Sequence, residues 1–264
     1  MTNDAPQLPD DTATLTHGGR MPLLGFGTWQ ITGVDGARAT STALESGYRH
    51  LDTATAYGNE GEVGRALTES GVPRGDVFVT TKCPPSLAGH ELDTLRKSLD
   101  LLQVDRVDLW LVHAPGEGST HVDMWRAFIQ AQEAGLATDI GVSNFDAAQL
   151  DDVSKATGVT PAVNQIEWSP LLYDAATVAE HLDRGIVLEG YSALRGGTLD
   201  HPTIIEIAER AGRTPAQVII RWHLQHGIVV IPKSVNADRI RANADVAGFS
   251  LGDEDMTALD ALGG

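Results

Sequence analysis

Residues 47–62 read GYRHLDTATAYGNEGE and contain the unit from which the predicted fold is built. It opens with a short run, Tyr48–Asp52, without clean alternation of polar and apolar residues, which is typical of parallel strands buried on both faces. Asn59, followed three residues later by Glu62, resembles a helix capping box, and Gly71 supplies a stop signal. The stretch therefore predicts a strand, a loop and a helix in succession.

This strand–loop–helix unit recurs along the chain. Helical patterns fill the gaps between strands, as where Thr214–Gln217 supplies a cap, a proline at the first helical position and a capping-box glutamine. The predicted strands are Leu23–Gly27, Tyr48–Asp52, Val77–Thr81, Asp108–Val112, Ala137–Val142, Ala162–Glu167, Ile186–Tyr191 and Ile228–Pro232. Eight units in 264 residues predict one α/β domain, residues 1–264, folded as a (β/α)8 TIM barrel.

The segment before the first strand has its own prediction. Residues 1–13 are expected to form a loose tail. Thr14–Arg20 carries His17-Gly18-Gly19 between polar β-formers, which predicts a short hairpin that caps the barrel floor.

Composition excludes several classes of partner. Acidic residues number 36 and basic residues 19, and the resulting net charge of −17 repels nucleic acid and anionic membranes. No apolar run is long enough to cross a bilayer, and the polar start does not resemble a signal peptide. A single cysteine rules out an internal disulfide and suits the reducing cytoplasm. We therefore expect a cytoplasmic protein that acts on small molecules.

Ionisable side chains end three consecutive strands. Asp52, Lys82 and His113 do so, and Tyr57 lies in the loop after Asp52. Each alone has an ordinary explanation: a helix cap, a solvated lysine, a hydrogen-bonded core histidine or a packed ring. At the active-site face of a barrel, however, all four would converge.

This set predicts a device that protonates an oxygen. A lysine ammonium at ~4 Å would lower the pKa of a tyrosine by roughly three units, so Lys82 is expected to bring Tyr57 toward the working range. Asp52 would hold Lys82 charged, and neutral His113 would orient a carbonyl group.

At this point the sequence resembles the aldo-keto reductase superfamily, and in particular its bacterial 2,5-diketo-D-gluconate reductase-like members. The similarity runs from about Thr14 to Leu262. The motifs that carry it are Gly25–Trp29, Gly47–Glu60, Val79–Lys82, Asp108–His113, Gly141–Phe145, Asn164–Glu167, Ile231–Ser234 and Arg239.

The resemblance implies a catalytic tetrad, Asp52, Tyr57, Lys82 and His113, with Tyr57 as general acid. It implies NADPH bound across the barrel mouth, without a Rossmann domain. The implied cofactor contacts are Ser143, Asn144 and Gln165 to the carboxamide, Tyr191 to the nicotinamide ring, Ser192 and Leu194 to the pyrophosphate, and Lys233, Ser234, Arg239 and Asn243 to the adenosine end. The implied substrate pocket is Trp29, Tyr57 and His113.

The expected reaction is the reduction of small aldehydes, α-dicarbonyls or keto-sugar acids to alcohols, by a monomer that needs no metal. Independently of the resemblance, Lys233, Arg239 and Arg241 form a basic cluster in an acidic chain, which favours the 2′-phosphate of NADPH over NADH.

The sequence also departs from the family pattern. Pro84 and Pro85 follow Lys82 closely, and Ala114 follows His113, where many relatives carry large aromatic residues, so we expect a wider pocket. Arg195 stands where a glycine is common, and Ala242 where many relatives have an acidic residue. Two other functions stay open: a lyase that forms a Schiff base on Lys82, and a non-enzymatic NADPH-binding regulator.

Overall fold

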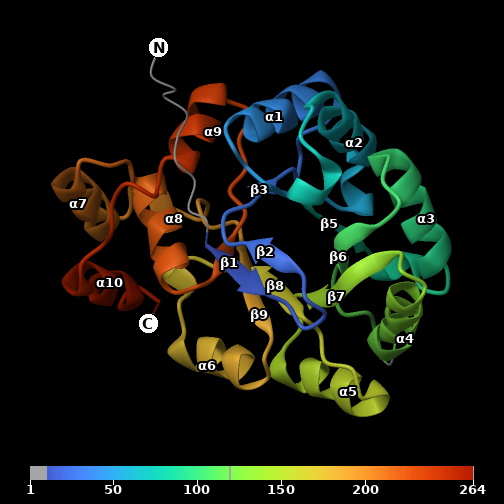
Figure 1. The fold of residues 1–264 in the computed structure, drawn as a ribbon. Coiled ribbons are helices and arrows are strands. Elements are labelled where there is room, and N and C mark those ends of the chain that lie inside the picture. The colour runs from blue at the N-terminus through green and yellow to red at the C-terminus, as the bar shows by residue number, and fades with distance from the viewer. Residues whose placement is uncertain (1–10, 119, 264) are drawn as a thin grey trace.

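A closed barrel of parallel strands forms the centre of the molecule (Figure 1). The computed structural model describes residues 11–118 and 120–263. Within them, neighbouring strands pair in chain order: β3 (Phe26–Gly27), β4 (His50–Asp52), β5 (Phe78–Cys83), β6 (Val107–Val112), β7 (Ala137–Ser143), β8 (Val163–Glu167), β9 (Val187–Tyr191) and β10 (Val229–Val230). The Gly25 amide donates to the Val230 carbonyl at 2.9 Å, and the Val230 amide to Leu23 at 2.8 Å. These two bonds close the barrel and confirm the predicted fold.

The helices surround the strands, as Figure 1 shows. In the described part of the chain they are α1 (Gly33–Glu45), α2 (Glu60–Glu69), α3 (Glu91–Leu102), α4 (Thr120–Glu133), α5 (Ala147–Thr157), α6 (Ala175–Asp183), α7 (Pro202–Ala211), α8 (Pro215–Gln225), α9 (Ala237–Ala244) and α10 (Asp253–Asp260). Every barrel strand is followed by at least one helix, and α7 and α10 are additional to the eightfold repeat.

Two predicted helix starts have different outcomes. The capping box of α8 is confirmed, because the Thr214 hydroxyl accepts from the Gln217 amide and the Gln217 side chain accepts from the Thr214 amide. The capping box of α2 is wrong, because the Asn59 side chain makes no cap hydrogen bond. That side chain turns inward and is fully buried. It donates to the carbonyls of Thr28 and Ile31, and it accepts from the Thr53 hydroxyl.

The predicted hairpin lies across one end of the barrel (Figure 1). Strands β1 (Thr12–Thr14) and β2 (Arg20–Pro22) pair antiparallel, and Met21 is fully buried. The buried Asp139 carboxylate of β7 accepts from the backbone amides of His17 at 3.0 Å and Gly19 at 3.2 Å, and so ties the turn to the barrel. The expected loose tail is wrong for residues 12 and 13, which belong to β1; residues 1–10 lie outside the described part.

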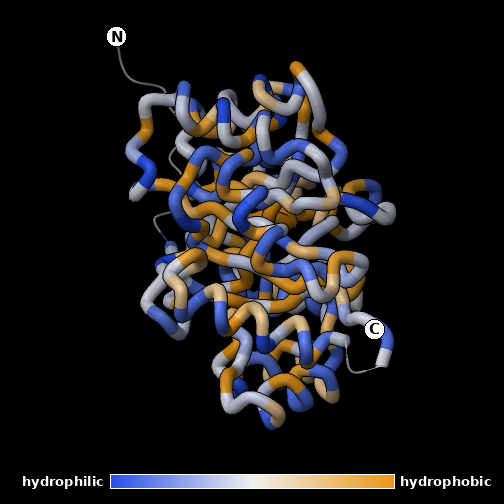
Figure 2. The backbone as a smooth tube through the Cα atoms, turned by 90° about the vertical axis from the view of Figure 1, so that its right-hand side faces the viewer, coloured by the Kyte–Doolittle hydropathy of each residue, from blue (hydrophilic) through white to orange (hydrophobic). Residues whose placement is uncertain are grey.

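Apolar residues fill the barrel and the space between strands and helices. Figure 2 shows hydrophobic segments gathered toward the middle and hydrophilic ones toward the edge. Trp110 of β6 is fully buried, and its ring stacks on Phe128 of α4 with 3.5 Å between centroids, so it is a packing residue. Among the described helices, none has the length and apolarity required to traverse a membrane.

Candidate active site

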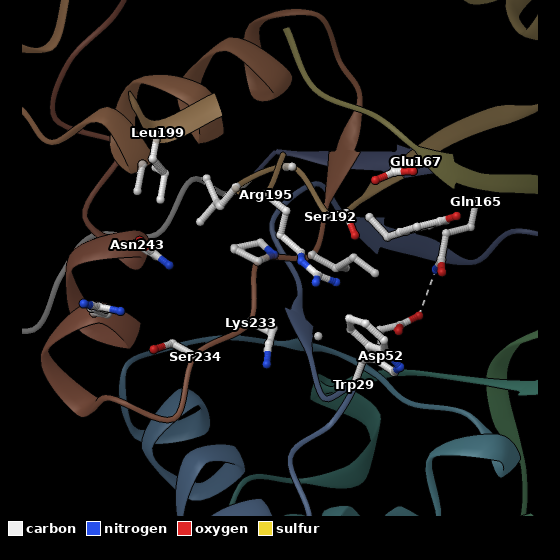
Figure 3. Close-up of a pocket in the computed structure, with 18 of the residues that line it drawn as sticks. Trp29, Asp52, Gln165, Glu167, Ser192, Arg195, Leu199, Lys233, Ser234 and Asn243 are labelled. Carbon is white, nitrogen blue, oxygen red and sulfur yellow. Dashed lines mark hydrogen bonds between the residues drawn. The ribbon is translucent and has the colours of Figure 1, made fainter. Parts of the chain in front are cut away.

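A cavity of about 810 Å³ opens at the carboxyl ends of the strands (Figure 3). This volume lies within the range of small-molecule and cofactor sites. Every predicted cofactor residue lines it: Ser143, Asn144, Gln165, Tyr191, Ser192, Leu194, Lys233, Ser234, Arg239 and Asn243. Trp29, Asp52, Tyr57 and His113 line it too, and Lys82 lies behind Asp52. The structure thus brings together residues that are up to 214 positions apart, from Trp29 to Asn243.

Asp52 and Lys82 form a buried ion pair because Asp52 ends β4 and Lys82 is the penultimate residue of the neighbouring strand β5. The Lys82 ammonium lies 2.6 Å from Asp52 Oδ1 and donates to the Thr53 carbonyl at 3.0 Å. The amide of Gln165 donates to the other oxygen of Asp52 at 2.9 Å, as the dashed line in Figure 3 marks. Burial alone lowers the pKa of Lys82, but the charge of Asp52 and its hydrogen bond bring the net pKa above its usual value. Lys82 is therefore a permanent cation.

Tyr57 lies between this cation and His113. It ends the short 3-10 helix η1 (Thr55–Tyr57), and the Lys82 nitrogen lies 5.2 Å from its ring centroid. Burial raises the pKa of Tyr57 more than the positive charge of Lys82 lowers it, so the net direction is upward. The expected net lowering of the Tyr57 pKa is wrong, because the loss of water around the buried phenol outweighs the charge of Lys82.

His113 follows β6, and its ring meets the Tyr57 ring edge-on at 5.6 Å between centroids. Burial, reinforced by the charge of Lys82, lowers the pKa of His113 to about 4. Its Nδ1 is buried without a hydrogen-bond partner among the described residues. His113 is therefore neutral near pH 7 and has unused hydrogen-bonding capacity beside Tyr57.

The loops after β7 and β9 meet on the next part of the wall. The Tyr191 hydroxyl donates to the side-chain oxygen of Asn144 at 2.8 Å, and the Asn144 amide donates to the Ser143 hydroxyl at 3.0 Å. Asn144 and Ser192 have left-handed backbones, with φ of 61° and 58°. Their amide and hydroxyl groups offer both donors and acceptors next to the half-buried ring of Tyr191. This donor set fits a nicotinamide, whose flat ring carries a carboxamide.

Two basic side chains line the cavity on the segment that runs from the end of β10 into α9. Lys233 and Arg239 line the cavity and pair with no carboxylate in residues 11–118 and 120–263. The third member of the predicted basic cluster, Arg241, does not line the cavity, and its guanidinium lies 3.5 Å from Asp238. Because Arg241 is ion-paired on the helix surface, the basic cluster at the cavity has two members and not the predicted three.

Sequence reasoning missed a buried acid below the tetrad. Glu189 of β9 is fully buried, and neither carboxyl oxygen has a hydrogen-bond partner in the described part of the chain. His50 Nε2 lies 3.8 Å away. Burial, together with the charge of Asp52, raises the pKa of Glu189 to about 8, so it is mostly protonated at pH 7. An acid inside the apolar run Ile186–Tyr191 was the available signal.

The cysteine next to the tetrad is not positioned to react, and no metal site is formed by the described residues. Cys83, next to Lys82, is fully buried, and burial raises the pKa of its thiol to about 12. Across the described ranges, the structure groups no three metal-ligating side chains that could hold an ion.

Comparison with known proteins agrees with this geometry. The family model described as "Aldo/keto reductase family" matches residues 23–263. An "Aldo-keto reductase" of Mycolicibacterium vanbaalenii is 47% identical over 255 residues, which is 95% of this chain and 91% of that protein. A "2,5-diketo-D-gluconic acid reductase B" of Corynebacterium sp. is 43% identical over 262 residues, with 97% and 94% covered. The crystal structure of an aldo/keto reductase from Brucella melitensis matches with a TM-score of 0.92 and 42% identity, over 97% of this chain and 100% of that one.

The fold and the tetrad-bearing cavity are those of a barrel oxidoreductase. The chain belongs to the aldo/keto reductase family.

Proposed function

We propose that this enzyme reduces the carbonyl group of small aldehydes, α-dicarbonyls or keto-sugar acids to an alcohol, with NADPH as reductant and Tyr57 as general acid. One observation carries the proposal. The Tyr57–His113 pair and Asp52, which is ion-paired with the buried Lys82, line the same cavity as Lys233 and Arg239.

The protein supplies the proton. Because burial raises the pKa of Tyr57, the phenol keeps its proton at neutral pH and is ready to donate it to a carbonyl oxygen. The charge of Lys82 then stabilises the phenolate that is left behind, and Asp52 holds the ammonium in place. Neutral His113 can donate a ring N–H to the same carbonyl oxygen.

The cavity suits a dinucleotide that supplies a hydride. Ser143, Asn144 and Gln165 would hold its carboxamide, and Tyr191 would stack on its nicotinamide. Ser192 and Leu194 would contact its pyrophosphate, and Lys233, Ser234, Arg239 and Asn243 its adenosine end. Since Lys233 and Arg239 have no described acidic partner, the extra phosphate of NADPH would be preferred to NADH.

Two observations support the proposed substrate class: the residues around the tetrad and the name of one relative. Neither Pro84, Pro85 nor Ala114 lines the cavity, and Trp29 is its large aromatic wall beside Tyr57. The name of the Corynebacterium relative specifies a keto-sugar acid as that protein's substrate. We further propose that the enzyme acts as a cytoplasmic monomer of one domain, since its one cysteine suits a reducing compartment.

Replacement of Tyr57 by phenylalanine tests the acid. NADPH oxidation would be followed across a panel of aldehydes, diketones and keto acids, and Tyr57→Phe is expected to lower kcat by about 10²–10⁴-fold because the proton donor is lost. NADPH binding, followed by fluorescence titration, should be unchanged. Tyr173→Phe, outside the cavity, is the matched control. Near-normal turnover by Tyr57→Phe would refute the assignment.

The two rival functions have less support. A Schiff-base lyase needs a neutral lysine that can attack a carbonyl, whereas Lys82 is buried, charged and bonded to Asp52 and Thr53. A non-enzymatic NADPH-binding regulator would bind NADPH tightly and leave the whole carbonyl panel unreduced, so the same screen separates it from an enzyme.

A further inference from the structure

Arg195 occupies a place in the cavity that the proposed chemistry leaves unused. Its guanidinium carbon lies 4.9 Å from the centroid of the Trp29 ring, and both residues line the cavity. In Figure 3 the Arg195 side chain extends from the loop after β9 toward Trp29, which comes from the loop after β3. The contact therefore joins two loops over the cavity.

Both loops are held by hydrogen bonds. The Arg195 amide donates to the Ser192 carbonyl at 2.9 Å, and the Thr198 amide donates back to the Arg195 carbonyl at 3.2 Å. On the other side, the buried amide of Asn59 donates to Thr28 and Ile31, which flank Trp29. The arginine and its aromatic platform are thus presented by defined turns, which reduces the entropy that binding a ligand would cost.

A cation–π contact of this kind uses none of the N–H donors of the guanidinium. A guanidinium that lies over an indole uses its flat face, while its N–H donors point outward in the plane. Arg195 forms no side-chain ion pair with any carboxylate in the described residues. Two parallel N–H groups of a guanidinium match the two oxygens of a carboxylate, so Arg195 has the donors that such a group requires.

The other charges in the cavity are already accounted for. Lys82 neutralises Asp52, and the proposed function assigns Lys233 and Arg239 to the adenosine end of NADPH. The exposed acid of the cavity wall, Glu167, lies on the other side of Ser192 from Arg195 in Figure 3. Arg195 is therefore the cation that remains for a ligand on the Trp29 side.

We propose that Arg195, in cation–π contact with Trp29, binds the carboxylate of the carbonyl substrate, so that the enzyme prefers aldehyde and keto acids to uncharged carbonyl compounds of the same size. This inference rests on the proposed carbonyl reduction and narrows its substrate class. It assigns specificity to a residue that stands where the family pattern has a glycine.

Matched acids and esters test this directly. A panel of aldehyde acids and their methyl esters, beginning with succinic semialdehyde, would be reduced with NADPH. The wild-type enzyme is expected to prefer each acid, and Arg195→Gln to lower kcat/KM for the acids about tenfold, mainly through KM, while the esters change little. Arg195→Lys should restore part of the preference. Arg65→Gln, which removes an exposed charge on α2 outside the cavity, should change neither.

A binding measurement separates the substrate from the dinucleotide as the source of the anion. Calorimetric titration of 4-hydroxybutyrate into the NADP+-saturated enzyme should show weaker binding in Arg195→Gln, with NADP+ affinity unchanged. Equal losses for acids and esters together with weaker NADP+ binding would mean that Arg195 serves a dinucleotide phosphate, and would overturn the proposal. A wild-type enzyme that does not distinguish acids from esters would also overturn it. Failure to reduce any carbonyl compound would instead overturn the proposed function.

Discussion

Among single residues, burial and the charge of Lys82 oppose each other at Tyr57 and reinforce each other at His113. The positive charge of Lys82 lowers the pKa of both Tyr57 and His113, while burial raises that of the phenol and lowers that of the imidazole. The outcome is a protonated Tyr57 and a neutral His113 at the same pH. In these states both side chains can donate a hydrogen bond, as the proposed reduction of a carbonyl group requires.

The pH profile of reduction should reflect this combination. Because the pKa of His113 is about 4 and that of Tyr57 is raised, kcat for reduction is expected to be flat from about pH 5.5 to about pH 8.5. It should fall only when His113 gains a proton at lower pH or Tyr57 loses one at higher pH. Steady-state rates in a constant-ionic-strength buffer series test this, and an inflection near the ordinary histidine value of ~6.5 would contradict it.

The tetrad residues could be predicted from the sequence, but their ionisation could not. Strand order alone brings Asp52, Lys82 and His113 to one face of a barrel, whatever the details of packing. The pKa of Tyr57 depends on how much water the folded loops exclude, which no spacing in the sequence reveals. The Arg241–Asp238 ion pair could not be predicted for a similar reason, because it depends on side-chain conformations that are set only once α9 has formed.

At the scale of elements, one buried amide connects the start of α2 to the wall of the cavity. Two hydrogen bonds that Asn59 donates, to the Thr28 and Ile31 carbonyls, hold the turn that carries Trp29, and a third, accepted from Thr53, ties Asn59 to the segment after β4. From the sequence, Asn59 was interpreted as a local helix cap, because a capping box is a short-range pattern and the loop that it binds lies about 30 residues earlier in the chain.

Loss of this amide should affect both stability and substrate binding. Asn59→Ala removes three buried hydrogen bonds and is expected to lower the free energy of unfolding by about 3 kcal/mol, although the Thr28 carbonyl keeps the Ile31 amide as a donor. KM for the carbonyl substrate should rise because Trp29 is no longer fixed. Urea denaturation and steady-state kinetics measure the two effects, with Gln130→Ala on the exposed side of α4 as control. Unchanged values for both would show that the turn holds itself.

The buried Glu189 of strand β9 destabilises the folded state when it is ionised. Its pKa is about 8 in the folded protein and near 4.5 in an unfolded chain, so between these values the folded state binds more protons. Stability should therefore fall as the pH rises from 5 to 8.

Glu189→Gln, which is neutral throughout, should remove this slope and stabilise the protein at pH 8 by on the order of 3 kcal/mol. Unfolding free energies at several pH values test this, with the exposed Glu180→Gln as control. A slope that persists in Glu189→Gln would assign it to another group.

At the scale of the whole molecule, the two ends of the barrel have separate tasks. The carboxyl ends of the strands hold the cavity, while the hairpin β1–β2 closes the opposite end through Asp139. The barrel was predictable because each unit carries its own strand and helix signals. The strands that close the barrel, β3 and β10, were less predictable. Each has only two residues, since its length depends on how the barrel closes and not on a local sequence pattern.

A change at the closed end should therefore affect stability alone. Asp139→Ala removes the acceptor for two backbone amides and is expected to cost about 2 kcal/mol of unfolding free energy, with kcat and KM unchanged. Asp139→Asn keeps one acceptor oxygen, so its free energy of unfolding should lie between those of the wild-type protein and Asp139→Ala. Thermal denaturation combined with kinetics checks this, and a kinetic effect would show that the two ends are coupled.

The burial of Cys83 makes the protein convenient for spectroscopy. Its thiol has no exposed surface and a pKa of about 12, and the sequence has no second cysteine. Maleimide dyes and spin labels therefore have no native target in the folded state. A cysteine placed at an exposed position such as Val235, in the loop between β10 and α9, would take up a single probe without any prior removal of native thiols.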